Sequence, residues 1–149
     1  MQKHELTKED QALVAEAVRT ALEPIAQIGG QCKPPLVAAA LRMDSGEVYT
    51  AQNLIADVGS ISMCAEPQAI AQANRHPDRK AAAIVAVYHQ PGRPPKVIPP
   101  CGRCREIITD FMPGFVILRD PGTEKLYKVR AGDLLPLKYA DYWKGDDLI

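Results

Sequence analysis

Residues 99–105 read Pro-Pro-Cys-Gly-Arg-Cys-Arg, and residues 63–66 read Met-Cys-Ala-Glu. Cys101 and Cys104 lie three positions apart at the start of a predicted helix, so both sulfur atoms can face the same side of it. Cys64 begins a second predicted helix. The positive end of a helix favours a deprotonated sulfur. We therefore expect a fold in which two helix N-termini meet, with three thiolates between them.

Three thiolates in this pattern suit a zinc ion. Three protein ligands leave a fourth position for water, which distinguishes a catalytic zinc site from a closed structural one. Glu66 follows Cys64 by two residues and would lie beside that water without binding the metal, where a carboxylate can accept and deliver protons. The sequence predicts one zinc ion per chain, held by Cys64, Cys101 and Cys104, with Glu66 as the catalytic proton carrier.

A structural alternative uses the same cysteines. Cys101 and Cys104 could form half of a four-cysteine knuckle that Cys64 and Cys32 complete. The proline before Cys101 and the Cys-Ala-Glu segment upstream favour the catalytic interpretation. Cys32 has no partner at ligand spacing, and we interpret it as a small buried apolar residue.

Arg103 lies between the two paired cysteines. Three thiolates give the zinc site a net negative charge, which weakens the metal as a Lewis acid. A guanidinium that donates a hydrogen bond to a thiolate sulfur would offset that charge, and we assign this role to Arg103. The alternative is a solvated surface arginine, and for Arg105 both interpretations remain open.

The composition limits the classes of partner. The chain has 149 residues, of which 46% are hydrophobic, so we expect one domain over residues 1–149. Eighteen basic residues balance eighteen acidic ones, which argues against nucleic-acid binding and favours a small uncharged substrate. The apolar runs are too short to cross a membrane. Four cysteines without an export signal fit a cytoplasmic protein.

The order of predicted elements indicates an α/β fold. Residues 7–27 and 64–74 have helical patterns, and a third helix covers 101–112. Strands are predicted at 36–41, 48–49, 81–88, 115–119 and 125–129, with a short helix at 134–135. Five prolines between Pro91 and Pro100 are expected to exclude regular structure there. We expect a three-layer α/β/α arrangement around a mixed sheet.

A ligand-x-Glu segment followed by Pro-Cys-x-x-Cys is the signature of zinc deaminases. From about Val37 to Leu135 the chain resembles the cytidine deaminase superfamily, in the branch with three cysteine ligands. The resemblance implies a mixed five-stranded sheet, a homotetramer or dimer, and a nucleoside base held between Asn53, the Ala65 backbone and Glu66. Cys64 argues against the cytosine, guanine, deoxycytidylate and transfer-RNA adenosine deaminases, which usually carry histidine there.

Two departures from this pattern concern the substrate. Cytidine deaminases carry Asn-x-Glu, whose glutamate accepts from a ribose hydroxyl, whereas this chain has Asn53-Leu54-Ile55. An unpaired buried hydroxyl costs roughly 1–3 kcal/mol. Pro67 stands where an arginine usually contacts the ligand sulfurs. Blasticidin S deaminase also lacks that arginine and carries the Cys-Gly-Arg-Cys-Arg run.

The leading hypothesis is therefore hydrolytic deamination of a cytosine-type nucleoside, cytidine, deoxycytidine or a close analogue, with release of ammonia. The first alternative is a deaminase of a modified aminated nucleoside such as blasticidin S. An alternative of another class is an inactive, zinc-stabilised binding protein. Tyr142 and Trp143 resemble a C-terminal pair in the blasticidin enzyme and could cover the pocket or pack at the surface.

Overall fold

The computed structural model describes residues 1–23, 36–78 and 80–142. Its helices are α1 (Lys8–Leu22), α2 (Ala65–Ala73), α3 (Gly102–Phe111) and α4 (Tyr139–Tyr142), with short 3-10 helices at Gly59–Ile61 and Ala131–Leu134. Its strands are β1 (Leu36–Met43), β2 (Val48–Gln52), β3 (Ala81–His89), β4 (Lys96–Ile98), β5 (Phe115–Arg119) and β6 (Leu126–Arg130). Cys32 and Trp143 lie outside the described residues, as do positions 24–27 of the predicted first helix.

The sheet is mixed and follows the order β2-β1-β3-β5-β6. β1 and β2, both predicted as strands, form an antiparallel hairpin with Ala40 opposite Thr50. β3 and β5 are parallel, and the other neighbouring pairs along this path are antiparallel. The predicted α/β architecture is confirmed, with the strand β4 added to the five expected ones.

β4 corrects the expectation that the proline-rich stretch has no regular structure. Its three residues pair antiparallel with the end of β3, with Val97 opposite Val87. Pro95 and Pro99 flank the strand but do not lie within it, so residues 96–98 keep the N–H groups that a sheet requires. β4 leads through Pro99 and Pro100 directly into Cys101, and it therefore positions the start of α3.

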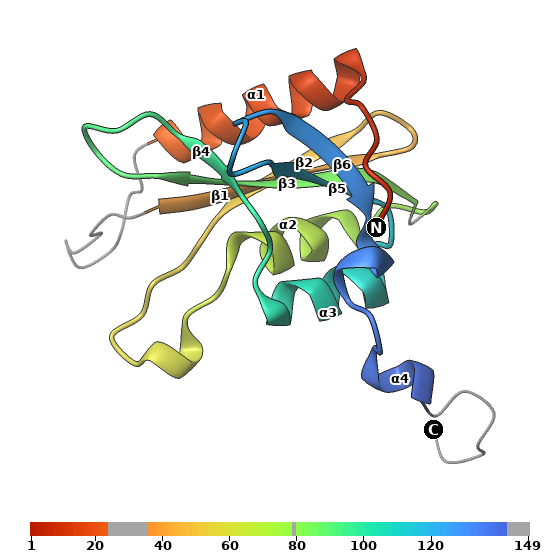
Figure 1. The fold of residues 1–149 in the computed structure, drawn as a ribbon. Coiled ribbons are helices and arrows are strands. Elements are labelled where there is room, and N and C mark those ends of the chain that lie inside the picture. The colour runs from red at the N-terminus through yellow and green to blue at the C-terminus, as the bar shows by residue number, and fades with distance from the viewer. Residues whose placement is uncertain (24–35, 79, 143–149) are drawn as a thin grey trace.

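Helices cover both faces of the sheet (Figure 1). α1 packs on one face against β1 and β3, whereas α2 and α3 lie on the other. Successive residues of β1 alternate between these layers: Ala38 and Ala40 belong to the core under α1, and Ala39 and Leu41 to the core under α2 and α3. Burial on both faces explains why β1 and β3 are almost continuously apolar.

Helix α1 is fixed to the sheet through its N-terminus. Thr7 and Asp10 form a capping box, in which each side chain accepts a hydrogen bond from the other's backbone N–H. Asp10 is completely buried and forms ion pairs with Arg42, at 2.8 Å, and with Lys128. One carboxylate thus connects α1 with β1 and β6.

Within the described part of the chain, no helix combines the length and apolar character that crossing a bilayer requires.

Candidate active site

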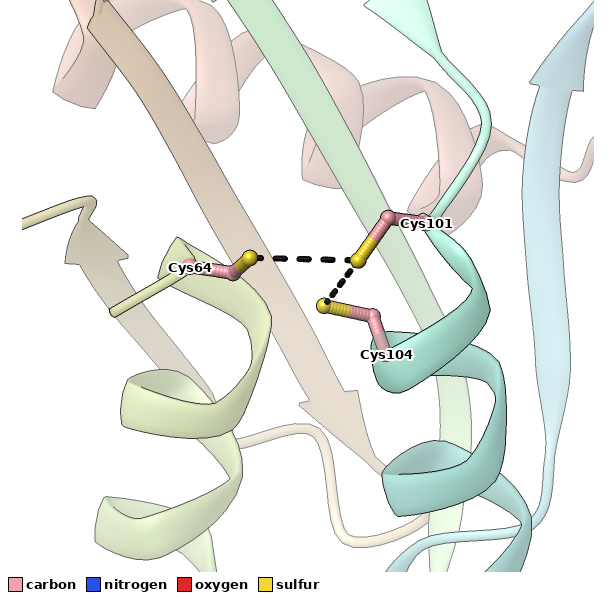
Figure 2. A group of neighbouring side chains, drawn as sticks. All are labelled: Cys64, Cys101 and Cys104. Atoms are coloured by element: carbon pink, nitrogen blue, oxygen red, sulfur yellow. Dashed lines mark hydrogen bonds between the residues drawn. The ribbon is translucent and has the colours of Figure 1, made fainter. Parts of the chain in front are cut away.

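Three cysteines gather where α2 and α3 begin (Figure 2). Cys64 is the N-cap residue of α2, Cys101 is the N-cap residue of α3, and Cys104 lies in the first turn of α3. The Sγ atoms of Cys64 and Cys101 are 3.9 Å apart, and those of Cys101 and Cys104 are 3.5 Å apart. All three sulfur atoms lie within 4.8 Å of one another.

This geometry fits a zinc ion. A Zn–S bond of about 2.3 Å in a tetrahedral site places two sulfurs about 3.8 Å apart. Among the described residues, no histidine or carboxylate joins the cysteines as a fourth ligand. The three-cysteine zinc site predicted from the sequence is confirmed, and three protein ligands are the number that catalytic zinc sites have. The structural alternative requires Cys32, which lies outside the described residues.

The cap positions explain why the sulfur atoms are available. Residues at an N-cap commonly use their side chains to bond the first N–H groups of the helix. Cys64 makes no such bond, although both Cys64 and Cys101 have the extended backbone of an N-cap. The sulfur atoms of Cys64 and Cys101 therefore lie at the positive ends of two helices.

The surroundings of the three thiols shift their pKa values in different directions. Burial raises the pKa of Cys64. For Cys101 burial acts in the same direction, but hydrogen bonds from the Cys104 backbone and from the neighbouring thiols lower the pKa overall. Burial, followed by the charge of Glu66, raises the pKa of Cys104. Metal binding must therefore displace protons from Cys64 and Cys104, so zinc affinity depends on pH.

Glu66 lies in the first turn of α2, and only 4% of its surface is exposed. Burial raises the pKa of its carboxyl group. Its charge also acts on all three thiols, which locates it beside the sulfur cluster. A buried carboxyl group that lies next to a metal site but is not one of its ligands is suited to proton transfer.

A cavity of about 260 Å³ opens onto this cluster. Its lining is mostly apolar and consists of Val37, Asn53, Leu54, Ile55, Ser62, Met63, Cys64, Glu66, Ile98, Pro99 and Cys101. Asn53 follows β2, and its Oδ1 accepts a hydrogen bond of 2.9 Å from the Val37 N–H. The cavity thus brings Asn53, Glu66 and two of the three cysteines together.

Three sequence predictions remain predictions at this point. Ala65 is the first residue of α2, and its side chain is fully buried, but the cavity lining does not include it. Arg103 is exposed, and among the described residues its side chain has no hydrogen bond to a sulfur atom. Tyr142 ends α4. The structure leaves the roles assigned to these residues untested, and it likewise leaves untested the catalytic role of Glu66 and the substrate contact of Asn53.

Arg105 takes neither of the two roles left open for it. Its Nε donates to the carbonyl oxygen of Pro100 at 3.1 Å, and its Nη1 donates to that of Leu134 at 3.2 Å. The guanidinium therefore fixes the turn that precedes Cys101 to the 3-10 helix that follows β6.

Gln68 was also not predicted from the sequence. Its side-chain NH2 group donates a hydrogen bond to the carbonyl oxygen of Cys64. Its position, one helical turn after Cys64, is compatible with this bond but does not distinguish it from a solvated glutamine.

Comparisons with known proteins agree with this site. The sequence profile described as "Cytidine and deoxycytidylate deaminase zinc-binding region" matches residues 7–119. Blasticidin-S deaminase from Bacillus cereus is 39% identical over 108 residues, which cover 69% of this chain and 76% of that protein.

Two solved structures show the same architecture. Cytidine deaminase from Burkholderia pseudomallei superposes with a TM-score of 0.65 at 27% identity, covering 88% of this chain and 98% of the other. Cytidine deaminase from Bacillus anthracis gives a TM-score of 0.70 at 21% identity, covering 90% and 91%, and this similarity concerns the fold. The profile match over most of the chain and the curated relative show that this protein belongs to the cytidine and deoxycytidylate deaminase zinc-binding family and is a zinc-dependent deaminase.

Proposed function

We propose that the chain hydrolyses the exocyclic amine of a cytosine-type nucleoside and releases ammonia. The observation that carries this proposal is the position of Glu66, a buried carboxyl group in the cavity that Cys64 and Cys101 also line. Asn53 lines the same cavity and offers a polar group for a substrate. The family supports the type of reaction, and the cavity supports a small substrate.

The zinc ion, when bound by Cys64, Cys101 and Cys104, supplies a water molecule that is activated near neutral pH.

The residues of the chain then have separate tasks. Glu66 accepts a proton from the attacking water and delivers it to N3 of the ring, while the oxygen adds to C4. Glu66 next carries the second water proton to the amino group, the C4–N bond breaks, and ammonia leaves. We assign the Ala65 N–H to the base and the Asn53 side chain to the sugar. The apolar lining, which includes Val37 and Ile98, limits the access of bulk water.

The balance of charge at the sulfur cluster is part of the proposal. We assign Arg103 to the thiolates, because it lies between Cys101 and Cys104 in the sequence and Pro67 carries no charge. The arginine is exposed and has no competing ion pair among the described residues.

A second candidate substrate is a modified cytosine nucleoside of the blasticidin S type. Ile55 lines the cavity and has no group that could accept a hydrogen bond from a ribose hydroxyl. An apolar wall at this position favours a sugar with fewer hydroxyls. The similarity to blasticidin-S deaminase supports the same candidate.

A substrate panel tests both candidates. The purified zinc protein is incubated with cytidine, deoxycytidine, cytosine and blasticidin S, and ultraviolet absorbance and released ammonia are followed. Turnover of cytidine or deoxycytidine supports the first candidate, and turnover of blasticidin S alone supports the second. Absence of ammonia from all four compounds, in protein with one zinc per chain, would contradict the proposed reaction.

We further propose that the chain forms a homo-oligomer through the apolar residues beside the cavity. Leu54, Ile55, Val58, Ile61 and Met63 are all exposed and lie in one segment between β2 and α2. Soluble chains rarely leave such a group uncovered. Because some of these residues also line the cavity, a second copy packed there would narrow its entrance. Sedimentation of the wild type and of Val58→Glu tests this. The variant is expected to dissociate into monomers. If the wild type and the variant are both monomeric, the proposal is contradicted.

A further inference from the structure

We propose that Gln68 is a positioning residue that fixes the zinc ligand Cys64 to the end of strand β2, and so sets the separation between the zinc site and Asn53. The part that concerns Asn53 rests on the proposed function, whereas the part that concerns Cys64 does not.

One nitrogen atom makes the connection. The Nε2 of Gln68 donates to the carbonyl oxygen of Gln52 at 2.7 Å and to that of Cys64 at 3.1 Å. A glutamine amide has two N–H donors, so a single side chain can satisfy both carbonyls. Gln68 is half-buried on α2, one turn after Cys64. The amide therefore bridges the start of the helix that carries Cys64 and Glu66 to the last residue of the strand.

The other end of this bridge leads directly to Asn53. Gln52 is the last residue of β2, and Asn53 follows it. The Asn53 N–H donates to the Val37 carbonyl at 2.8 Å, which fixes this point to β1. The two walls of the cavity, one with Asn53 and the other with Cys64 and Glu66, are thus joined through Gln68.

The segment between these walls has a second closure. Leu54 and Met63 exchange two backbone hydrogen bonds of 2.9 Å each. That pair holds the ends of the segment together, but both residues precede Cys64 and neither belongs to α2. Among the described residues, Gln68 is the one whose side chain bonds both to the backbone of the zinc ligand Cys64 and to strand β2. Partners that orient metal ligands affect both metal affinity and activity.

The chain contains a matched control one turn further along α2. The Nε2 of Gln72 donates to the carbonyl of Thr50 at 3.0 Å. Gln68 and Gln72 therefore make the same type of bond, from the same helix to the same strand. Gln72 does not reach Cys64, and Thr50 does not line the cavity. A general loss of helix–strand attachment would affect both variants, whereas a positioning role belongs to Gln68 alone.

The experiment compares Gln68→Met and Gln72→Met with the wild-type zinc protein. Methionine keeps the length of glutamine and removes its donors. Three quantities are measured: the rate of zinc transfer to a chromogenic chelator, the absorption bands of the cobalt-substituted protein, and kcat and KM on the best substrate of the panel. Gln68→Asn serves as a second variant, because its amide is one methylene shorter and cannot reach both carbonyls.

We expect zinc transfer from Gln68→Met to be about tenfold faster, the lower end of the effect of lost outer partners on metal affinity. Its cobalt bands are expected to shift and its KM to rise, with Gln68→Asn in between, while Gln72→Met stays close to the wild type in all three. If Gln68→Met and Gln72→Met match in zinc transfer and cobalt spectrum, the proposal is wrong. If the wild type turns over no nucleoside, the proposed function fails, but the first two measurements still decide the role of Gln68.

Discussion

The side-chain oxygen of Asn53 accepts a hydrogen bond from the Val37 N–H at 2.9 Å. This bond fixes the orientation of the amide, because its oxygen must face the Val37 N–H of β1. The NH2 group of Asn53 is turned away from that N–H, and it is the donor that the side chain can offer to the cavity. A donor at this point selects a substrate that presents an acceptor, such as a sugar hydroxyl oxygen.

The variant Asn53→Asp isolates that donor. An aspartate keeps one oxygen for the Val37 N–H, so the free energy of unfolding should change little, but the NH2 group becomes a second oxygen. We expect kcat/KM for the nucleoside to fall about tenfold to a hundredfold, since an unpaired buried polar group costs roughly 1–3 kcal/mol. Steady-state kinetics together with thermal unfolding check this. Wild-type kcat/KM in Asn53→Asp would exclude a donor role for this side chain.

Ile55 offers a test of substrate choice in which a contact is added and not removed. The change Ile55→Glu adds an acceptor to the cavity wall, and we expect kcat/KM for cytidine to rise by about tenfold, equivalent to roughly 1.4 kcal/mol. Free cytosine has no sugar, so its turnover should stay unchanged.

Val58→Glu is the control for this gain. It adds the same charge to the same exposed apolar segment, but Val58 does not line the cavity. Ile55 is 48% exposed and Val58 is 59% exposed, so the two glutamates start from similar solvation. Equal gains from Ile55→Glu and Val58→Glu would indicate a general effect of charge and would contradict recognition of a hydroxyl.

The cysteine cluster could be predicted because its geometry is local. Cys101 and Cys104 face the same side of α3 by helical spacing, and Cys64 needs only to begin the neighbouring helix. The apolar run of β3 was equally readable, because a strand buried on both faces has no polar alternation. These parts of the fold depend on the order of residues within one element.

The parts that were missed depend on contacts between distant segments. β4 forms because β3 offers a free edge at Val87, which the proline-rich sequence around Val97 does not reveal. Arg105 donates to a carbonyl 29 residues away, and Gln68 to one 16 residues away. Backbone carbonyls carry no sequence signal, so a side chain that binds them cannot be distinguished from a solvated one before the fold is known.

The buried carboxylate of Asp10 makes stability depend on pH. Burial by itself raises its pKa, but hydrogen bonds from Lys128, the Thr7 backbone and Arg42 lower it below the usual 3.8. A lowered pKa in the folded state means that the contribution to stability is complete above pH 3.8 and is lost as the pH falls through the folded-state value. The free energy of unfolding should therefore decrease in this acidic range.

The variant Asp10→Asn should lack that acid-dependent loss and should be less stable at neutral pH by about 3 kcal/mol, because two cations lose their buried partner. Denaturant unfolding at a series of pH values measures both effects. Asp120→Asn is the control: the pKa of Asp120 is also low, about 2, mainly because of a hydrogen bond from Lys3, but this pair lies at the surface. A loss in Asp120→Asn as large as that in Asp10→Asn would contradict the role of burial.

Glu66→Gln separates proton transfer from metal binding. Glutamine has nearly the same shape and cannot carry a proton between water, ring nitrogen and amine, so kcat should fall at least about a thousandfold, within the range known for general acid–base groups. Zinc content should remain one per chain, because the three-cysteine cluster does not include Glu66.

Glu106→Gln on α3 is the control, since Glu106 pairs with Lys138 and does not line the cavity. Ammonia release and metal analysis of the same samples provide the measurement. Full activity in Glu66→Gln would remove this residue from the mechanism, whereas loss of zinc would make it part of the metal site.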